Sequence, residues 1–329
     1  MCGIAGYCRN TERTSIPNGR RFGVALSHGI ESRGRDATGF AWQEQKDDSN
    51  VWYSKDAGPA TRVAHRLALP GSGITNLLAH TRFATLGGSD NVDNVHPVVA
   101  GPITVTHNGR VENHDELVKL SGLERIGEVD SWAIPALLCQ QEALGADHPT
   151  ELLELIHGVA AIAWLDANEP GVVHLARLST RPLTIGWTKR GDLVYSSTRA
   201  TLALGAAKGG VGVTDVIDIP EGTYLRVRDG AFEEWSEFKV NPPAKQQADL
   251  DMPGAKSKPA KKAKRKGQSK GQMKLPPYTN MFSSVSDYDP DLDMSTWEPS
   301  DEDLLAGFDS WEENMRNRGY AHGITDRFS

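Results

Sequence analysis

Apolar residues in the first 239 positions fall into short runs separated by turns that contain glycine, proline or asparagine. Short apolar runs between turn signals are typical of buried strands, whereas apolar residues three or four positions apart are typical of helices. Two groups of strands with helices between and after them predict an α+β fold in which helices cover two stacked sheets. We predict helices at 20–30, 61–69 and 198–204, a strand pair around 101–102, and further strands at 3–8, 40–42, 51–54, 74–80, 159–165, 172–176, 183–187, 193–196, 223–227 and 232–235.

The dipeptide Asn108-Gly109 ends the second strand of that pair. An Asn-Gly dipeptide after a strand is usually a hairpin turn. Here Asn113 follows at once, with Glu116 three positions later, and this is the pattern of a helix cap. We therefore place Asn108 and Gly109 at a bend between a strand and a loop near a helix start. A side-chain amide and a backbone N–H can point at one spot there, and such a pair can stabilise an oxyanion.

Length and composition favour one domain over 2–239, a linker over 240–299 and a tail over 300–329. The net charge of −7 favours solubility and says little about fold. No run approaches the roughly 20 apolar residues of a membrane span, and the first residues lack the apolar core of a signal peptide. Three cysteines in so long a chain do not form a disulfide framework. We expect a cytoplasmic protein without membrane contact.

Residues 241–280 are rich in proline, lysine, glutamine and glycine, which is typical of a disordered linker. The part from Lys256 to Lys274 is basic, and residues 287–303 are acidic. A basic run can hold nucleic acid electrostatically. No aromatic residue interrupts this run, so base stacking is not available there. A solvated linker is therefore favoured over a contact with nucleic acid.

A short amphipathic helix is predicted beyond the linker, because Leu304, Phe308, Trp311 and Met315 fall at helical spacing on one face. The polar residues 300–303 are a start signal and Gly319 is a stop signal. A helix of this kind at the end of a flexible tail suits docking into a groove of a partner. It can equally fold back on its own domain, and the sequence leaves both arrangements open.

Cys2 is the first candidate for chemistry, because removal of Met1 turns it into the amino terminus. The nucleophile and a base then share one residue, since the free α-amino group titrates near ~7.7–8.0 and is partly uncharged at neutral pH. This is the N-terminal nucleophile arrangement. Gly3 and Gly6 let substrate and backbone approach the chain end closely. The alternative is that Cys2 is a small buried apolar residue near a strand start.

Two polar segments supply further candidates. Arg33 and Asp36 lie in a turn before a predicted strand, and without further context they would simply pair with each other. Residues 86–90, after Arg82, are polar and rich in glycine, so they form either an ordinary loop or one that closes over a small ligand. Asp130 precedes an apolar run, but Pro135 favours a helix that begins later and leaves Asp130 in a loop.

Taken together, these pieces resemble the glutaminase domain of the class II glutamine amidotransferases. The family is exemplified by glucosamine-6-phosphate synthase and glutamine phosphoribosyl-pyrophosphate amidotransferase. The matching segments follow the order of the family and cover roughly the first 130 residues. They are Cys2-Gly3-Ile4-Ala5-Gly6, Arg33-Gly34-Arg35-Asp36-Ala37-Thr38-Gly39, His80-Thr81-Arg82-Phe83-Ala84-Thr85, His107-Asn108-Gly109 with Glu112-Asn113, and Asp130.

The resemblance implies a four-layer αββα sandwich of the N-terminal nucleophile hydrolase type, and it implies a role for each matching residue. Cys2 would be the nucleophile, and Asn108 and Gly109 would bind the tetrahedral oxyanion. Arg82 and Thr85 would belong to the glutamine site, with Arg82 on the α-carboxylate. Asp130 would hold the α-ammonium, and the turn with Arg33 and Asp36 would give structural support.

Charge alone supports part of this assignment, because a site that selects a free amino acid needs one cation and one anion placed apart. Arg82 and Asp130 supply that pair. Leu86 departs from the synthase branch, which commonly has histidine there, and this puts rate or substrate affinity in doubt. We interpret His80, His96 and His107 as structural hydrogen bonders, because the terminal amine already fills the role of base.

The sequence therefore predicts an enzyme that hydrolyses L-glutamine to glutamate and passes ammonia to an acceptor enzyme in trans, with no metal or cofactor. After about Lys239 we find no room for an ammonia-using domain and no phosphate-binding glycine loop. Two alternatives stay open. One is an N-terminal cysteine acylase acting on another amide, and the other is a glutamine-sensing or scaffold module with a vestigial Cys2.

Overall fold

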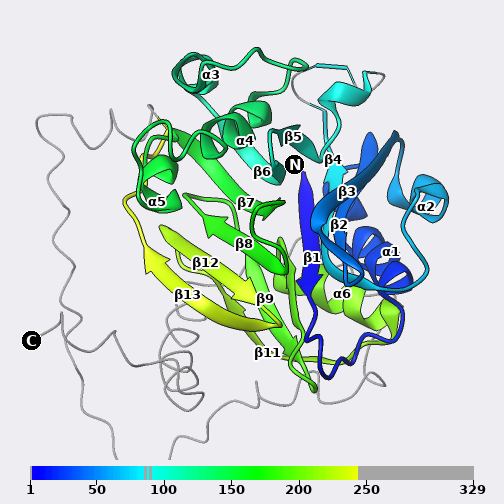
Figure 1. The fold of residues 1–329 in the computed structure, drawn as a ribbon. Helices are drawn as coiled ribbons and strands as arrows, with labels where there is room; N and C mark the ends of the chain where they lie inside the picture. Colours follow the sequence, from blue (N-terminus) through cyan, green and yellow to red (C-terminus); the bar gives the residue numbers. More distant parts are fainter. Residues whose placement is uncertain (1, 85–86, 89–90, 244–329) are drawn as a thin grey trace, which may run out of the picture. The chain divides into compact units, whose positions relative to one another are not determined.

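The computed structural model describes residues 2–84, 87–88 and 91–243. Within these residues the strands form two antiparallel sheets (Figure 1). The seven-stranded sheet has the order β11 (Val213–Asp218), β9 (Thr184–Thr188), β10 (Leu193–Ser196), β1 (Gly3–Cys8), β4 (Ile74–Arg82), β2 (Ala37–Glu44), β3 (Asp47–Ala57). The six-stranded sheet has the order β13 (Ala231–Glu237), β12 (Thr223–Arg228), β8 (Val172–Arg177), β7 (Gly158–Asp166), β6 (Ile103–Val111), β5 (Val98–Ala100).

The helices form the two outer layers. The α-helices are α1 (Gly19–Gly29), α2 (Ala60–Val63), α3 (His114–Ser121), α4 (Ala133–Leu138), α5 (Pro149–Leu153) and α6 (Arg199–Gly209). The 3-10 helices are η1 (Glu31–Arg33), η2 (Ala64–Arg66), η3 (Val92–Asn94) and η4 (Asp130–Trp132). Residues of α1, α2 and α6 pack on the seven-stranded sheet, and residues of α3, α4 and α5 pack on the six-stranded one.

Three apolar cores hold the layers together, because strand residues alternate between the two faces of each sheet. On β1, Ile4 and Cys8 face the core between the sheets, while Ala5 and Tyr7 face the helices. Between the two sheets, Leu78 of β4 and Leu175 of β8 belong to the same buried cluster. The αββα sandwich expected from the resemblance is thus the observed fold.

Several boundaries differ from the prediction. The structure describes only α2 and the short η2 where a helix over 61–69 was predicted. Strand β6 continues through Asn108 and Gly109 to Val111, so this dipeptide pairs with β7 instead of forming a bend. Helix α3 begins after Asn113 as predicted, but the Asn113 side chain bonds to Leu155 O and accepts from His157 N instead of capping the helix.

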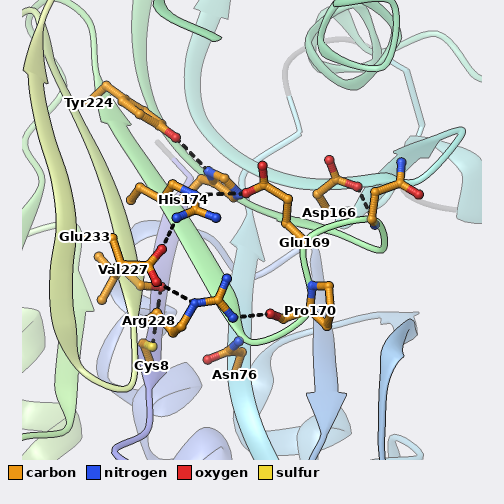
Figure 2. Close-up of polar contacts among 12 residues, drawn as sticks. Cys8, Asn76, Asp166, Glu169, Pro170, His174, Tyr224, Val227, Arg228 and Glu233 are labelled. Carbon is orange, nitrogen blue, oxygen red and sulfur yellow. Dashed lines mark hydrogen bonds and ion pairs between the residues drawn. The ribbon is translucent and has the colours of Figure 1, made fainter. Parts of the chain in front are cut away.

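A polar cluster fastens the six-stranded sheet near the Cys8 end of β1 (Figure 2). His174 shares a 2.9 Å hydrogen bond with the Tyr224 hydroxyl through Nδ1 and lies 3.2 Å from Glu169 through Nε2. Arg228 donates to Pro170 O at 2.6 Å. The hydrogen bond from His174 lowers the pKa of Glu169 to about 2. These contacts join the turn after β7 to β8 and β12.

Candidate active site

Cys2 lies at the start of the central strand β1, which pairs with β4 and β10. The neighbouring elements approach so closely that β1 requires glycine at two positions. A Cβ added at Gly3 would lie 2.8 Å from Thr81 Oγ1, and one added at Gly6 would lie 2.0 Å from Leu77 O. The small residues of the first motif therefore let Cys2 sit against the end of β4.

The Cys2 thiol contacts the backbone that follows β4. Phe83 N donates to Sγ at 3.5 Å, and Sγ lies 3.7 Å from Phe83 O. Burial raises the pKa of this thiol, while the Phe83 N–H and the charge of Arg82 lower it and the charge of Asp130 raises it. The thiol is therefore protonated at neutral pH, so a base must take its proton before it can attack.

Asn108 and Arg33 both hold the Cys2 backbone. The Asn108 amide donates to Cys2 O at 2.9 Å and accepts from Arg33 Nη2 at 3.3 Å, in the amide orientation that satisfies both groups. Arg33 Nε also donates to Cys2 O, at 3.1 Å. Strand β6 thus places the Asn108 amide against the backbone of Cys2, the residue that carries the candidate nucleophile.

Gly109 follows on β6, where its backbone is pressed against β7. A Cβ at this position would lie 1.9 Å from Val159 O and 2.7 Å from the ring nitrogen Nε2 of His107. Only glycine fits this close approach, so the backbone of Gly109 is held rigidly next to Asn108.

Arg82 and Asp36 bond to the segment that follows β4. Arg82 ends β4, is buried, and donates to Gly87 O at 2.8 Å. Asp36 donates through its N–H to Arg82 O at 2.9 Å and accepts from Ala84 N at 2.7 Å. Arg33 therefore bonds to Cys2 itself, whereas Asp36 bonds to residues on either side of Phe83, the residue that contacts the thiol. Thr85 and Leu86, which were also singled out in the sequence, lie outside the described residues.

Asp130 is buried at the first position of η4 and not in a loop before a helix. Its Oδ2 accepts from Val111 N at 2.7 Å, which ties η4 to the end of β6. Its charge acts on the pKa of both Cys2 and Arg82. The structure therefore brings a cation, an anion and a thiol within electrostatic reach of one another.

Three histidines near the site are buried: His80, His96 and His107. The rings of His80 and His96 stack with centroids 4.1 Å apart, and His80 Nε2 lies 3.1 Å from His107 O. Burial lowers the pKa of His80 to about 3 and also lowers the pKa of His96 and His107. All three rings are therefore neutral near pH 7.

The pattern of the sequence alone did not indicate two supporting residues. Ser131 Oγ shares a 2.8 Å hydrogen bond with His107 Nδ1. Buried Asn94 donates to Gly88 O at 3.2 Å and to Glu128 Oε2 at 3.1 Å, and so links the glycine-containing loop to the segment before η4. A lone serine or asparagine carries no signal in a sequence, because its role here depends on packing between distant elements.

Among the described residues, no group of three or more His, Cys, Asp or Glu side chains could hold a metal ion. None of the helices in the described ranges is long and apolar enough to cross a membrane.

The described domain thus has two stacked antiparallel sheets between helical layers, and Cys2 lies at the start of the central strand β1. The chain is similar in sequence and in fold to known proteins. The chain is 34% identical over 212 residues to a glutamine–fructose-6-phosphate aminotransferase (isomerizing) of Pyrobaculum aerophilum, covering 61% of this chain and 34% of the relative. The enzyme of the same name from Bacillus cereus is 31% identical over 215 residues, with 61% and 33% covered.

Solved structures give the same answer for the fold. Glutamine phosphoribosylpyrophosphate amidotransferase from B. subtilis superposes with a TM-score of 0.57 and 16% identity, covering 73% of this chain and 50% of that one. A structure described as the allosteric regulatory enzyme of purine biosynthesis has a TM-score of 0.58 and 19% identity, with the same coverage. No protein-family model matches the chain.

The resemblance to the class II glutamine amidotransferases is therefore confirmed for the described domain. The chain spans about a third of the length of the curated relatives it matches.

Proposed function

We propose that the domain hydrolyses L-glutamine to L-glutamate and ammonia through a thioester on Cys2. The observation that carries this proposal is the convergence of four groups on Cys2. The Asn108 amide donates to its backbone oxygen, the Phe83 N–H donates to its Sγ, and the charges of Arg82 and Asp130 act on its thiol. An amide donor beside the nucleophile is what a tetrahedral oxyanion needs. A separated cation and anion are what the two charged α-groups of an amino acid need.

The terminal amine would supply the base that the protonated thiol requires. Once Met1 is removed, the α-amino group of Cys2 takes the proton from Sγ, and Sγ attacks the carbon of the glutamine side-chain amide. The C–N bond then breaks, and the ammonium form of the amine returns the proton to the departing ammonia. Water next attacks the thioester and gives its proton to the amine. The C–S bond breaks, glutamate leaves, and the thiol is restored.

Arg82 and Asp130 would bind the two charged α-groups of glutamine and so select the substrate. The Arg82 guanidinium is buried, and such a planar two-donor group is suited to an α-carboxylate. In Asp130, Oδ2 accepts from Val111 N, so we assign the other carboxylate oxygen to the α-ammonium. Gly109 would add its N–H to the Asn108 amide around the oxyanion.

Glutamate release tests the proposal. The wild-type chain should release glutamate and ammonia in equal amounts, and Cys2→Ala should abolish both while the far-ultraviolet circular dichroism stays unchanged. Cys139→Ala is the matched control, since Cys139 is a half-buried cysteine that caps the end of α4 and burial raises the pKa of its thiol. Release that persists in Cys2→Ala would refute the proposal.

We propose further that the ammonia passes to an acceptor enzyme in trans, docked by the face formed by Leu304, Phe308, Trp311 and Met315. This face and the run from Lys256 to Lys274 lie outside the described residues. Trp311→Ala should leave glutamate release unchanged and weaken complex formation with the acceptor, measured by sedimentation of the two purified proteins. An unchanged complex would exclude this face.

A further inference from the structure

The residues that would bind the oxyanion and the α-ammonium belong to different layers of the domain. Asn108 and Gly109 lie on β6 of the six-stranded sheet. Asp130 lies on η4, next to the helix α4 that packs on this sheet. If the substrate is to meet both groups at once, the spacing between β6 and η4 must be fixed.

Two hydrogen bonds join these elements within the described structure. Val111 N donates to Asp130 Oδ2 at 2.7 Å, and His107 Nδ1 and Ser131 Oγ share a bond of 2.8 Å. Both pairs are buried. The bond from Val111 holds one oxygen of the Asp130 carboxylate, but the carboxylate can still rotate about that oxygen. The second bond holds the neighbouring residue and so restricts that rotation.

The His107 ring is also the support on which Gly109 rests. Residues 107 and 109 lie on the same face of β6, since side chains alternate along a strand. The ring nitrogen Nε2 comes within 2.7 Å of the place where a Cβ of Gly109 would lie. One imidazole ring therefore touches the backbone of the oxyanion segment and bonds to η4.

The backbone of His107 also contacts the other sheet. His107 O lies 3.1 Å from Nε2 of His80, which is on β4 of the other sheet. Burial lowers the pKa of His107, although the charge of Asp130 raises it. The ring is therefore neutral near pH 7, where it bonds to Ser131.

We propose that the hydrogen bond between His107 and Ser131 is a positioning device that keeps Asp130 in register with Asn108 and Gly109, and so makes the site select substrates with an α-amino group. His107 and Ser131 are positioning residues, because they act through Asp130 and Gly109 and need not touch the substrate. This inference rests on the proposed hydrolysis of glutamine.

The test compares two covalent probes. The first is a diazoketone analogue of glutamine, and the second is the same diazoketone without the α-amino group. Both can alkylate a competent Cys2 without an acceptor enzyme, so the ratio of their second-order labelling rates reports how well the α-ammonium is held. The wild-type chain should prefer the first probe.

Ser131→Ala should reduce this preference about fivefold, since a buried hydrogen bond contributes about 1 kcal/mol net. The loss should fall mainly on the amino-bearing probe. Ser131→Thr keeps the hydroxyl and should keep the wild-type preference. Ser121→Ala is the matched control, because Ser121 is a buried serine that donates to Val118 O on α3. A general loss of stability would change both rates together and leave the ratio unmoved.

The outcomes separate the two claims. A wild-type chain that neither probe labels would refute the proposed function and this inference with it. A labelled wild-type chain with an unchanged ratio in Ser131→Ala would refute the inference alone. His107→Asn provides a second check, since an amide near the Nδ1 position can still bond Ser131 but no longer fills the space beneath Gly109. It should slow both probes and keep more of the preference than Ser131→Ala does.

Discussion

Asp130 has two tasks in this account, and two substitutions separate them. Its Oδ2 accepts a 2.7 Å hydrogen bond from Val111 N, and its charge would hold the α-ammonium of glutamine. Asp130→Asn keeps an acceptor for Val111 N but removes the charge. Asp130→Ala removes both. The asparagine variant should therefore be stable and bind poorly, whereas the alanine variant should fail on both counts.

The structure sets the size of each effect. Asp130 is 8% exposed, so Asp130→Ala leaves the Val111 N–H buried without this acceptor, which costs about 1–3 kcal/mol of unfolding free energy. Asp130→Asn should cost less than about 1 kcal/mol, because a neutral oxygen replaces a charged one at the same place. A hydrogen bond to a charged group is worth about 1.5–3 kcal/mol, so losing the ammonium contact should weaken binding about tenfold to a hundredfold.

Two measurements decide the matter. Urea titrations give the stability of each variant, and the rate of Cys2 alkylation by the amino-bearing diazoketone gives the binding loss. The probe without the amino group should label wild type and Asp130→Asn at similar rates. If Asp130→Asn reacted with the amino-bearing probe as fast as wild type, Asp130 would not be the ammonium site. If Asp130→Ala were as stable as wild type, the hydrogen bond from Val111 to Asp130 would not contribute to the free energy of unfolding.

Three further predictions concern the loop beside the site and the stability of the fold. Gly6→Ala should lose about 3 kcal/mol of unfolding free energy, because its Cβ would lie 2.0 Å from Leu77 O. Gly71→Ala is the control and should be near neutral, because a Cβ there meets nothing within 4 Å. Equal urea midpoints for the two variants would contradict this prediction. Asn94→Ala should slow labelling of Cys2 about threefold to tenfold, since the loop beside Arg82 loses a buried amide anchor, and an unchanged rate would remove that anchor from the account. The pKa of Glu169 is lowered to about 2 from roughly 4.3 in an unfolded chain, so its stabilising contribution is present above pH ~4.3 and is lost as the pH falls through ~2. The difference in urea midpoint between wild type and Glu169→Gln should therefore shrink over that range, and a constant difference would show that the carboxylate charge does not stabilise the fold.

The sequence predicted the fold well where apolar runs are continuous, as in β1 and β7. It failed where the period of two is broken. Strand β11 was missed because a bulge separates Thr214 from Ile217 and Asp215 has a φ of 51°. Helix α5 was missed because its five residues are too short for a helical pattern, and His148, an unusual residue for this purpose, caps it.

The candidate site was predictable as a set of motifs but not as a geometry. Pairing of β1 with β4 brings Cys2 to Phe83, and the sequence did not predict which strands pair. The extension of β6 beyond Asn108 was not predictable, since Asn-Gly favours a turn in isolation and the pairing with β7 overrides that preference. The role of Ser131 was invisible because it depends on how η4 packs on β6.

The most direct test of the central claim is an intact mass with peptide mapping after incubation with the diazoketone analogue of glutamine. The account predicts one adduct, on a Cys2 that has lost Met1, which excess glutamine blocks and which is absent in Arg82→Ala. Cys8 should stay unlabelled, because burial raises the pKa of its thiol to about 12. A folded chain that keeps Met1, or a mature Cys2 that stays unlabelled, would contradict the account.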